Sequence, residues 1–587
     1  MDSSEPAGVR PEGAELWPLL ACAALAVPML IAHNVPPSAT FFNQAAAFIG
    51  WGGWLALMSV ALIGRSFMPR GGLALLLGAL GLLVGAALAS PLWTGLPWAL
   101  ALSPAGTLAA AAWVAWVAAA LARQGLAGPA FRALCFGLAA AGLASAAIGL
   151  VQVYAPGAAD GNWIAHSTIT GRAVGNLRQP NHLSSLLLWA IIAVLWLGQA
   201  QVLPRAAAVA LAAVMMFAVV LTASRTGMLG AGLLCAWGLV DRRLARPIRL
   251  ALVLAPLAYA LLFQGAASYA HQAEQVFGGE GRLSGGDISS SRFGIWSNTL
   301  ALIAMHPWTG VGFGEFNFAW SLTPFPGRPI AFFDHTHNLP LQLIVELGLP
   351  LGSLVLGLLL AALLWAGKRA VDAQGDDATV VRAALAMVVM IALHSLLEYP
   401  LWYAYFLFPA AFVFGLCLAL PPPAGAEVAE HARLPAVVLS LAVLAGGGLA
   451  LRDYMTVVKI FAAPEDGSSL AERIAAGQRS WFFSHHADYA AATTPEHPSE
   501  AMAAFDGAPH YLLDARLLMA WARALDESGD TDRARYLSAR LAEFRNEQAA
   551  EFFASCADEK TDPAALPFQC LLPQRNDLGY RDFRSPR

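Results

Sequence analysis

About thirteen runs of apolar residues constrain the fold of this chain more than any other feature. A helix needs about 20 apolar residues to cross a bilayer, and most of the runs are close to that length. The runs lie at residues 16–32, 44–64, 71–90, 104–122, 130–153, 182–200, 205–222, 226–240, 248–266, 339–366, 382–398, 401–420 and 434–451. Because 58% of the 587 residues are hydrophobic and only 13% are charged, a soluble globular fold is excluded. The expected fold class is all-α, a polytopic membrane protein with about 13 transmembrane helices.

Basic residues in the connections between these runs predict the orientation, because Lys and Arg are retained on the cytoplasmic side of short loops. Alternate connections carry them, as in the segment with Arg242 and Arg243, whereas the connections 33–43 and 91–103 carry none. The amino terminus is therefore predicted to be cytoplasmic. An odd number of spans places the tail on the opposite side, together with two long connections. These connections are residues 154–181 and 267–337.

The tail, residues 452–587, differs in character from residues 1–451, which form the predicted transmembrane domain. Apolar residues recur there at helical spacing among many charges, over residues 468–479, 510–526 and 531–554. A Gly529-Asp530 break separates the last two segments. The pattern predicts a helical domain that contains an antiparallel helix pair, similar to the pairs of tetratricopeptide-type peptide-binding repeats.

Several classes of site are not supported by the sequence. Basic residues occur singly and the net charge is −4, so no nucleic-acid partner is expected. No Cys-x-x-Cys or His-Glu-x-x-His spacing occurs, and neither a metal nor a cofactor is expected. The segment Gly310-Val311-Gly312-Phe313-Gly314 resembles a nucleotide loop only superficially, because no strand precedes it. In a tail outside the cytoplasm, Cys556 and Cys570 are expected to form a disulfide.

The most polar motif, Asp334-His335-Thr336-His337-Asn338, ends the second long connection, directly before an apolar run. A side chain at this boundary can meet a lipid-borne substrate from one side and a soluble substrate from the other. Imidazole is the side chain whose ordinary pKa suits proton transfer near neutrality, so His337 is the candidate general base. The alternative is a structural histidine that only forms hydrogen bonds.

Four arginines lie on the predicted outer side, against the trend of the other basic residues. They are Arg172, Arg178, Arg225 and Arg292. A charge at the membrane costs about 2.5 to 3.5 kcal/mol on insertion scales, so each arginine needs a partner. The guanidinium fork matches phosphate oxygens in a bidentate way, which predicts a diphosphate-binding site. The alternative is a set of ion pairs with carboxylates such as Glu274, Glu280, Asp287 or Glu315.

Two further polar segments are predicted on the same side. In the first, Asn181 follows Pro180 and is expected to cap the next helix, which leaves Arg178, Gln179 and His182 unexplained. The second is the hairpin that contains His394, Glu398 and Tyr399, which either contacts substrate or forms a buried hydrogen-bond set. The predicted supporting and substrate-binding residues are Gln179, Asn181, His182, His335, Asn338, Glu398 and Tyr399.

Together these motifs resemble the superfamily of bacterial O-antigen ligases, O-antigen polymerases and O-linked oligosaccharyltransferases. The hallmark that they resemble is His335-Thr336-His337-Asn338 followed by Leu341-Gln342 and Glu346-Leu347-Gly348. Ser224-Arg225-Thr226-Gly227, Arg292 with Trp296, and the segment 306–316 are also similar to it. The early loop 33–43, the hairpin 394–403 and the tail resemble the protein-glycosylating branch of that superfamily.

The resemblance implies transfer of an oligosaccharide from undecaprenyl diphosphate to Ser or Thr hydroxyls of a periplasmic or pilin-like protein. It also implies a metal-independent reaction in the bacterial inner membrane, with His337 as base and the arginines at the donor diphosphate. The partners would be the lipid-linked donor, the acceptor protein and membrane lipid. An O-antigen ligase or polymerase with a glycan acceptor is the alternative. A transporter of lipid-linked sugars is a third reading, but charges distributed through the helix interiors and internal repeats are not seen.

Overall fold

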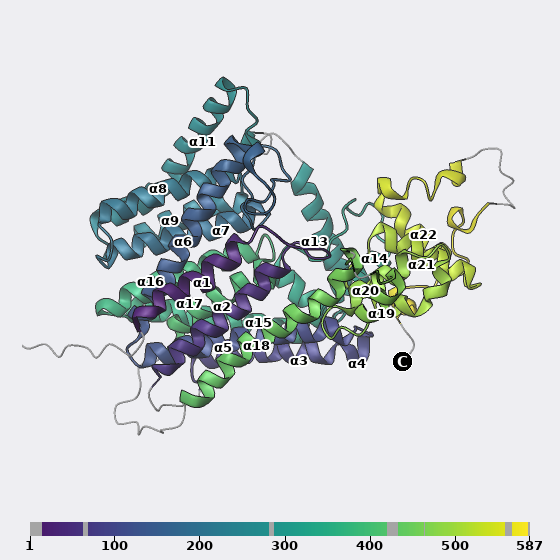
Figure 1. The fold of residues 1–587 in the computed structure, drawn as a ribbon, viewed down its shortest axis with the longest axis horizontal. Coiled ribbons are helices and arrows are strands. Elements are labelled where there is room, and N and C mark those ends of the chain that lie inside the picture. The colour runs from purple at the N-terminus through teal and green to yellow at the C-terminus, as the bar shows by residue number, and fades with distance from the viewer. Residues whose placement is uncertain are drawn as a thin grey trace, which may run out of the picture.

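The computed structural model describes residues 14–62, 69–280, 287–419, 433–462, 464–465, 467–557 and 566–584. The Asp287 side chain and residues 281–286 of the second long connection lie outside the described part. Every regular element in the described residues is a helix, which confirms the all-α prediction. Figure 1 shows most of the helices gathered in one bundle, with α19 to α22 of the tail to one side of it.

Each of the predicted apolar runs corresponds to a helix or a pair of helices. They are α1 (Trp17–Leu30), α2 (Phe41–Val60), α3 (Gly72–Ala89), α5 (Trp98–Arg123), α6 (Ala127–Tyr154), α7 (Pro180–Gln199), α8 (Arg205–Leu221), α9 (Arg225–Val240), α10 (Arg246–Val253) with α11 (Ala255–Gln272), α15 (Leu339–Asp372), α16 (Gly375–Ser395), α17 (Ala404–Leu418) and α18 (Arg433–Phe461). Among the described residues, seven helices are long and apolar enough to span a membrane. The pair α10 and α11, bent by 55°, makes an eighth if it is one span. The fold is thus that of a polytopic membrane protein, and thirteen spans remain a prediction.

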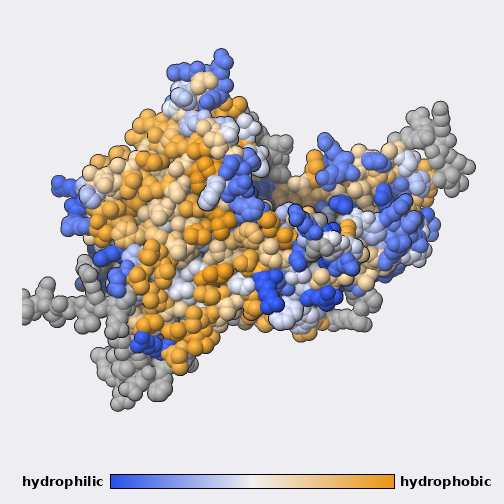
Figure 2. Space-filling view, in the orientation of Figure 1, coloured by the Kyte–Doolittle hydropathy of each residue, from blue (hydrophilic) through white to orange (hydrophobic). Residues whose placement is uncertain are grey.

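The surface differs between the helix bundle and the tail. Figure 2 shows hydrophobic residues over most of the helix bundle, while hydrophilic residues predominate over the tail. Within the bundle, α7 is the central helix: its apolar window is entirely buried, and it packs against α6, α8, α9 and α16. A helix that is apolar on all sides is buried either in lipid or in the protein interior, and α7 lies in the protein interior. The polar residues at the start of α7 are consequently carried into the interior of the protein.

A kink in α15 explains two glycine motifs of the sequence. At Gly348 the backbone φ is 75°, so the helix is interrupted and nearby carbonyl groups are available. The Val311 amide donates to the carbonyl of Val345 (2.9 Å), and the Gly312 amide donates to the carbonyl of Glu346 (3.0 Å). A Cβ on Gly310 would lie 2.5 Å from the Glu346 carbonyl carbon. These glycines therefore allow close backbone packing.

The tail contains α19 (Leu470–Gly477), α20 (Ser484–Thr493), α21 (Ala515–Glu527) and α22 (Thr531–Phe544). The turn at Gly529, with φ of 86°, joins α21 to α22 as predicted. The second helix of this pair ends at Phe544, earlier than the predicted 554. Because α18 continues to Phe461, the predicted domain boundary at 451 falls inside a helix.

Cys556 and Cys570 form a disulfide in the tail, with their Cα atoms 5.2 Å apart. A closed loop of this size contributes roughly 3 kcal/mol in the chain-entropy model. We expect a membrane-impermeant maleimide to label these cysteines in intact spheroplasts only after reduction. The paired variant C556S/C570S is the control for labelling at the other cysteines. Labelling that needs no reductant, or that needs a permeabilised membrane, contradicts this prediction.

Candidate active site

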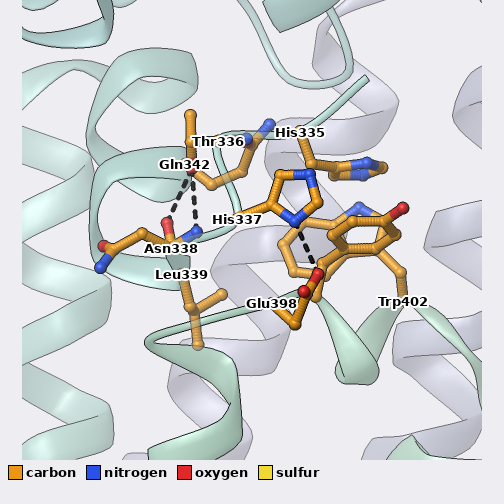
Figure 3. A pocket seen from close by; sticks show the side chains of 9 residues that line it. His335, Thr336, His337, Asn338, Leu339, Gln342, Glu398 and Trp402 are labelled. Carbon is orange, nitrogen blue, oxygen red and sulfur yellow. Dashed lines mark hydrogen bonds and ion pairs between the residues drawn. The ribbon is translucent and has the colours of Figure 1, made fainter. Parts of the chain in front are cut away.

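His337 and Glu398 form the centre of the candidate site (Figure 3). The Nδ1 atom of His337 lies 2.6 Å from Oε2 of Glu398. Glu398 is buried, while His337 keeps 16% of its side chain exposed. Within the described residues, Nε2 of His337 has no recorded hydrogen-bond partner. The carboxylate therefore favours the tautomer with hydrogen on Nδ1, which leaves the lone pair of Nε2 free to accept a proton.

Glu398 also binds groups from two other helices. Arg292 of α13 (Asp287–Met305) places Nη2 2.5 Å from Oε1 of Glu398, and Asn181 of α7 donates to the same oxygen at 2.7 Å. Burial alone would raise the pKa of Glu398. The hydrogen bond and charge of His337, followed by the charge of Arg292, outweigh burial and lower this pKa to about 2. The carboxylate is thus charged throughout the physiological range.

Asn181 corrects one prediction, because it does not cap α7. The N-cap position is Gln179, Pro180 takes the first helical position, and neither Gln179 nor another side chain caps this end. Asn181 instead joins two elements: it donates to Glu398 and accepts a hydrogen bond from the Ser224 hydroxyl at 2.6 Å. Ser224 in turn caps α9 by accepting from the Gly227 amide at 3.2 Å. The start of α9 is therefore connected to Glu398 through one amide.

The loop that carries His337 is held from both sides. The Thr336 amide donates to Gln342 of α15 (2.8 Å), and the Gln342 amide group donates to the Glu346 carboxylate (3.0 Å). On the other side, the Trp296 indole donates to the Thr336 carbonyl at 2.9 Å. Figure 3 shows His337 projecting from this loop toward Glu398. The backbone of His337 has φ of 54°, a conformation that costs free energy in a non-glycine residue and needs such support.

Asn338 is placed at the start of α15, where its side chain accepts from the Leu341 amide at 3.0 Å and caps the helix. Its amide nitrogen also donates to the Leu396 carbonyl at 3.1 Å, which ties α15 to the hairpin that carries Glu398. The predicted supporting role of Asn338 thus takes the form of a structural link within the site.

Aromatic rings form one wall of the site. The His335 ring stacks on Tyr399 with ring centres 4.4 Å apart, and its edge contacts Trp402. Asp334 lies 3.1 Å from Nδ1 of His335. The edge of Tyr399 also meets His337, with ring centres 5.0 Å apart. Burial raises the pKa of Tyr399, so the phenol is neutral. A pocket surrounds His337 and Glu398. Thr336 and Trp402 also line it and were not among the predicted site residues.

The four arginines separate into two groups. Arg292 is bound to Glu398, and Arg225 is the first residue of α9, next to Ser224. In the described part of the chain, no hydrogen bond or ion pair of the Arg225 guanidinium is recorded, so its donors are available to a ligand. Arg172 binds the carbonyls of residues 222 and 223, and Arg178 binds those of residues 32 and 39. These two guanidinium groups have structural contacts, and their donor role remains a prediction.

His182 and Gln179 are the remaining predicted residues of the site. His182 is buried beside Tyr403, with ring centres 4.8 Å apart, and near His394. Neither Nε2 of His182 nor Oε1 of Gln179 has a hydrogen-bond partner within the described residues. No group of three or more His, Cys, Asp or Glu side chains in that part of the chain is arranged to hold a metal ion.

Three segments of the chain match known protein families. Residues 207–356 match the O-antigen ligase family, and residues 173–197 match the family described as protein glycosylation ligase. Residues 382–555 match the C-terminal family of virulence factor membrane-bound polymerases. A general O-oligosaccharyltransferase of Acinetobacter baylyi is 30% identical over 292 residues. Over these segments the chain is similar to the O-antigen ligase family and to an O-oligosaccharyltransferase.

A ComP-specific O-oligosaccharyltransferase of the same organism is 28% identical over 260 residues. The alignments cover 48% and 42% of this chain, and 50% and 44% of the two relatives, so the chain spans about half the length of each. In this chain, residues of the three matched segments meet at the Glu398 carboxylate. The first supplies Arg292 and His337, the second supplies Asn181, and the third supplies Glu398.

Proposed function

We propose that this protein transfers a preassembled oligosaccharide from undecaprenyl diphosphate to Ser or Thr hydroxyls of a protein acceptor. The observation that carries the proposal is the pair of His337, directly before α15, and Glu398. Nε2 of this imidazole is free within the described residues, and Arg292 lies beside the pair. The proposal includes a multi-pass protein of the bacterial inner membrane, with a cytoplasmic amino terminus and a periplasmic tail. Acceptor proteins of the periplasm or of pilin type would reach His337 from that side.

His337 is the proposed general base. As the acceptor hydroxyl attacks the anomeric carbon of the donor, its proton passes to Nε2 of His337. The new bond joins the acceptor oxygen to the sugar, while the bond from the sugar to the diphosphate breaks. Undecaprenyl diphosphate leaves with the bonding electron pair. Glu398 is a positioning residue that fixes the tautomer of His337 and stabilises the imidazolium formed in this step.

Arg225 and Arg292 are the proposed ligands of the donor diphosphate, and no metal is required in this scheme. Arg225 is available, whereas Arg292 has to share its donors between Glu398 and the diphosphate. A diphosphate that recruits Arg292 weakens the ion pair with Glu398. The carboxylate then acts mainly on His337, so donor binding and activation of the base would be coupled.

Arg225→Lys and Arg292→Lys test the diphosphate site, because lysine keeps the charge and loses the planar fork. We expect the Kd for the lipid diphosphate donor to rise by about tenfold in each variant, the equivalent of about 1.4 kcal/mol. Arg242→Lys, on the predicted cytoplasmic side, is the matched control and should leave the Kd unchanged. Unaltered donor binding in both site variants places the diphosphate elsewhere.

The proposed acceptor is a protein, and a deletion strain distinguishes it from a glycan acceptor. Both curated relatives are named as O-oligosaccharyltransferases and a short segment matches a protein glycosylation ligase, which favours a protein acceptor. We expect a deletion strain to lose O-linked glycopeptides and to retain its lipopolysaccharide profile. Intact glycopeptides with loss of O-antigen would support the alternative, an O-antigen ligase or polymerase with a glycan acceptor.

A further inference from the structure

The tail and the second long connection share one hydrophobic core. The Phe332 ring, five positions before His337, stacks on Phe544 of α22 with ring centres 3.9 Å apart. The hydroxyl of Tyr536 donates to the Leu322 carbonyl at 2.6 Å. Figure 1 shows α14 (Phe316–Leu322) beside the tail helices, and α14 contacts α22 directly. The segment that leads to His337 is thus covered by tail residues.

An ion pair also joins the second long connection to α22. Arg328 is fully buried in the connection, and its guanidinium binds Glu543 of α22 at 2.9 Å. The guanidinium also lies over the Phe544 ring, 4.4 Å from its centre, and donates to carbonyl groups of residues 320, 321 and 323. A buried charge needs a partner, and Glu543 of α22 supplies the carboxylate for Arg328.

Asn317 joins the tail to the residues next to His337. Its side-chain nitrogen donates to the Phe333 carbonyl at 2.8 Å, and its oxygen accepts from the Leu513 amide of the tail at 2.8 Å. The Phe333 ring meets His337 at 90°, with ring centres 5.4 Å apart. A second buried pair, Glu315 with His510 of the tail at 2.8 Å, supports the same segment.

We propose that the tail is a positioning element of the active site, which fixes the backbone before His337 through Asn317, Arg328 and Phe332. The inference rests on the proposed function, since the base that the tail would position is His337. It differs from a tail that only presents the acceptor protein, because its effect is on the rate of the chemical step for every acceptor. It also explains why residues 317 to 333 are bound to tail residues along their length.

Asn317→Asp tests this proposal with a change of one atom. A carboxylate can still accept from the Leu513 amide but cannot donate to the Phe333 carbonyl, so the link toward His337 is lost and a negative charge faces this carbonyl at a buried position. We expect kcat to fall about 10- to 100-fold, by the same factor for two acceptor peptides of unrelated sequence, with acceptor KM within about twofold. Amide hydrogen exchange of residues 333–338 should become faster.

Asn546→Asp is the matched control, because this substitution makes the same change of charge. Asn546 accepts a hydrogen bond from the Gln548 amide, within the tail. Phe332→Leu is a second test that removes the stack on Phe544 and keeps an apolar side chain; it should act like Asn317→Asp. A raised acceptor KM with unchanged kcat and unchanged exchange in both test variants overturns the proposal. A wild-type protein without transfer activity contradicts the proposed function instead, and the exchange of residues 333–338 still tests the positioning.

Discussion

Replacing His337 with alanine is expected to lower the turnover of glycan transfer by about 10²- to 10⁴-fold, the usual range for loss of a general base. In the candidate pocket, the His337 imidazole combines an Nε2 proton acceptor without a partner among the described residues with an orientation set by Glu398 at 2.6 Å. Donor binding should change little, because the proposed diphosphate ligands are Arg225 and Arg292. The measurement is kcat for glycopeptide formation at saturating donor, together with the donor Kd.

His166→Ala is the matched control for this variant, because His166 is an exposed histidine of the first long connection. It should retain wild-type turnover. A His337→Ala protein that inserts and elutes normally, and still transfers at the wild-type rate, would remove His337 from the mechanism.

Replacing Glu398 with glutamine is expected to lower kcat by roughly 10³-fold, because the amide no longer fixes the tautomer of His337 or stabilises its charged form. The same change leaves the partly buried Arg292 without its ion-pair partner, which costs roughly 3 kcal/mol of stability. Glu398 then no longer competes with the diphosphate for the Arg292 guanidinium. The donor should therefore bind as tightly as before or more tightly. The combination of lower kcat with an equal or lower donor Kd separates positioning from a general loss of structure.

The pH dependence of stability gives a second readout for Glu398. Because its pKa in the folded protein is lowered to about 2, its ionised form contributes stability above the pKa of an unfolded glutamate. This contribution is lost as the pH falls through the folded value. Glu398→Gln should therefore lower Tm at neutral pH, and the difference from wild type should shrink below about pH 4. An equal Tm difference at pH 7 and pH 3 contradicts this assignment of charge.

The helices of this protein could be predicted from sequence because apolar length is a local property. The candidate site could be predicted in part for a related reason: polar residues at the ends of apolar runs, such as His337 and Glu398, stand out individually. Their pairing could not be predicted from local patterns. His337 and Glu398 are 61 positions apart, and Asn181 and Glu398 are 217 apart, so only the packed fold shows that one carboxylate joins them.

The predicted cap at Asn181 was wrong, and the segment that covers the tail helices was not predicted. Asn181 has the residue type of a helix cap, but Pro180 at the first helical position moves it into the helix, where its amide meets Glu398 instead. The tail has amphipathic helices, which predict that one face is covered without specifying the covering segment. In the structure that segment is the connection before His337, which contributes Phe332 and Arg328 to a shared core.

The most direct test of the central claim uses purified protein, a defined undecaprenyl diphosphate-linked oligosaccharide and a peptide that contains Ser or Thr. Mass spectrometry should detect the glycopeptide and free undecaprenyl diphosphate with the wild-type protein, with and without a chelator, and neither product with His337→Ala. A transporter would form no glycopeptide under these conditions. Absence of glycopeptide with the wild-type protein, or equal amounts with His337→Ala, would contradict the account.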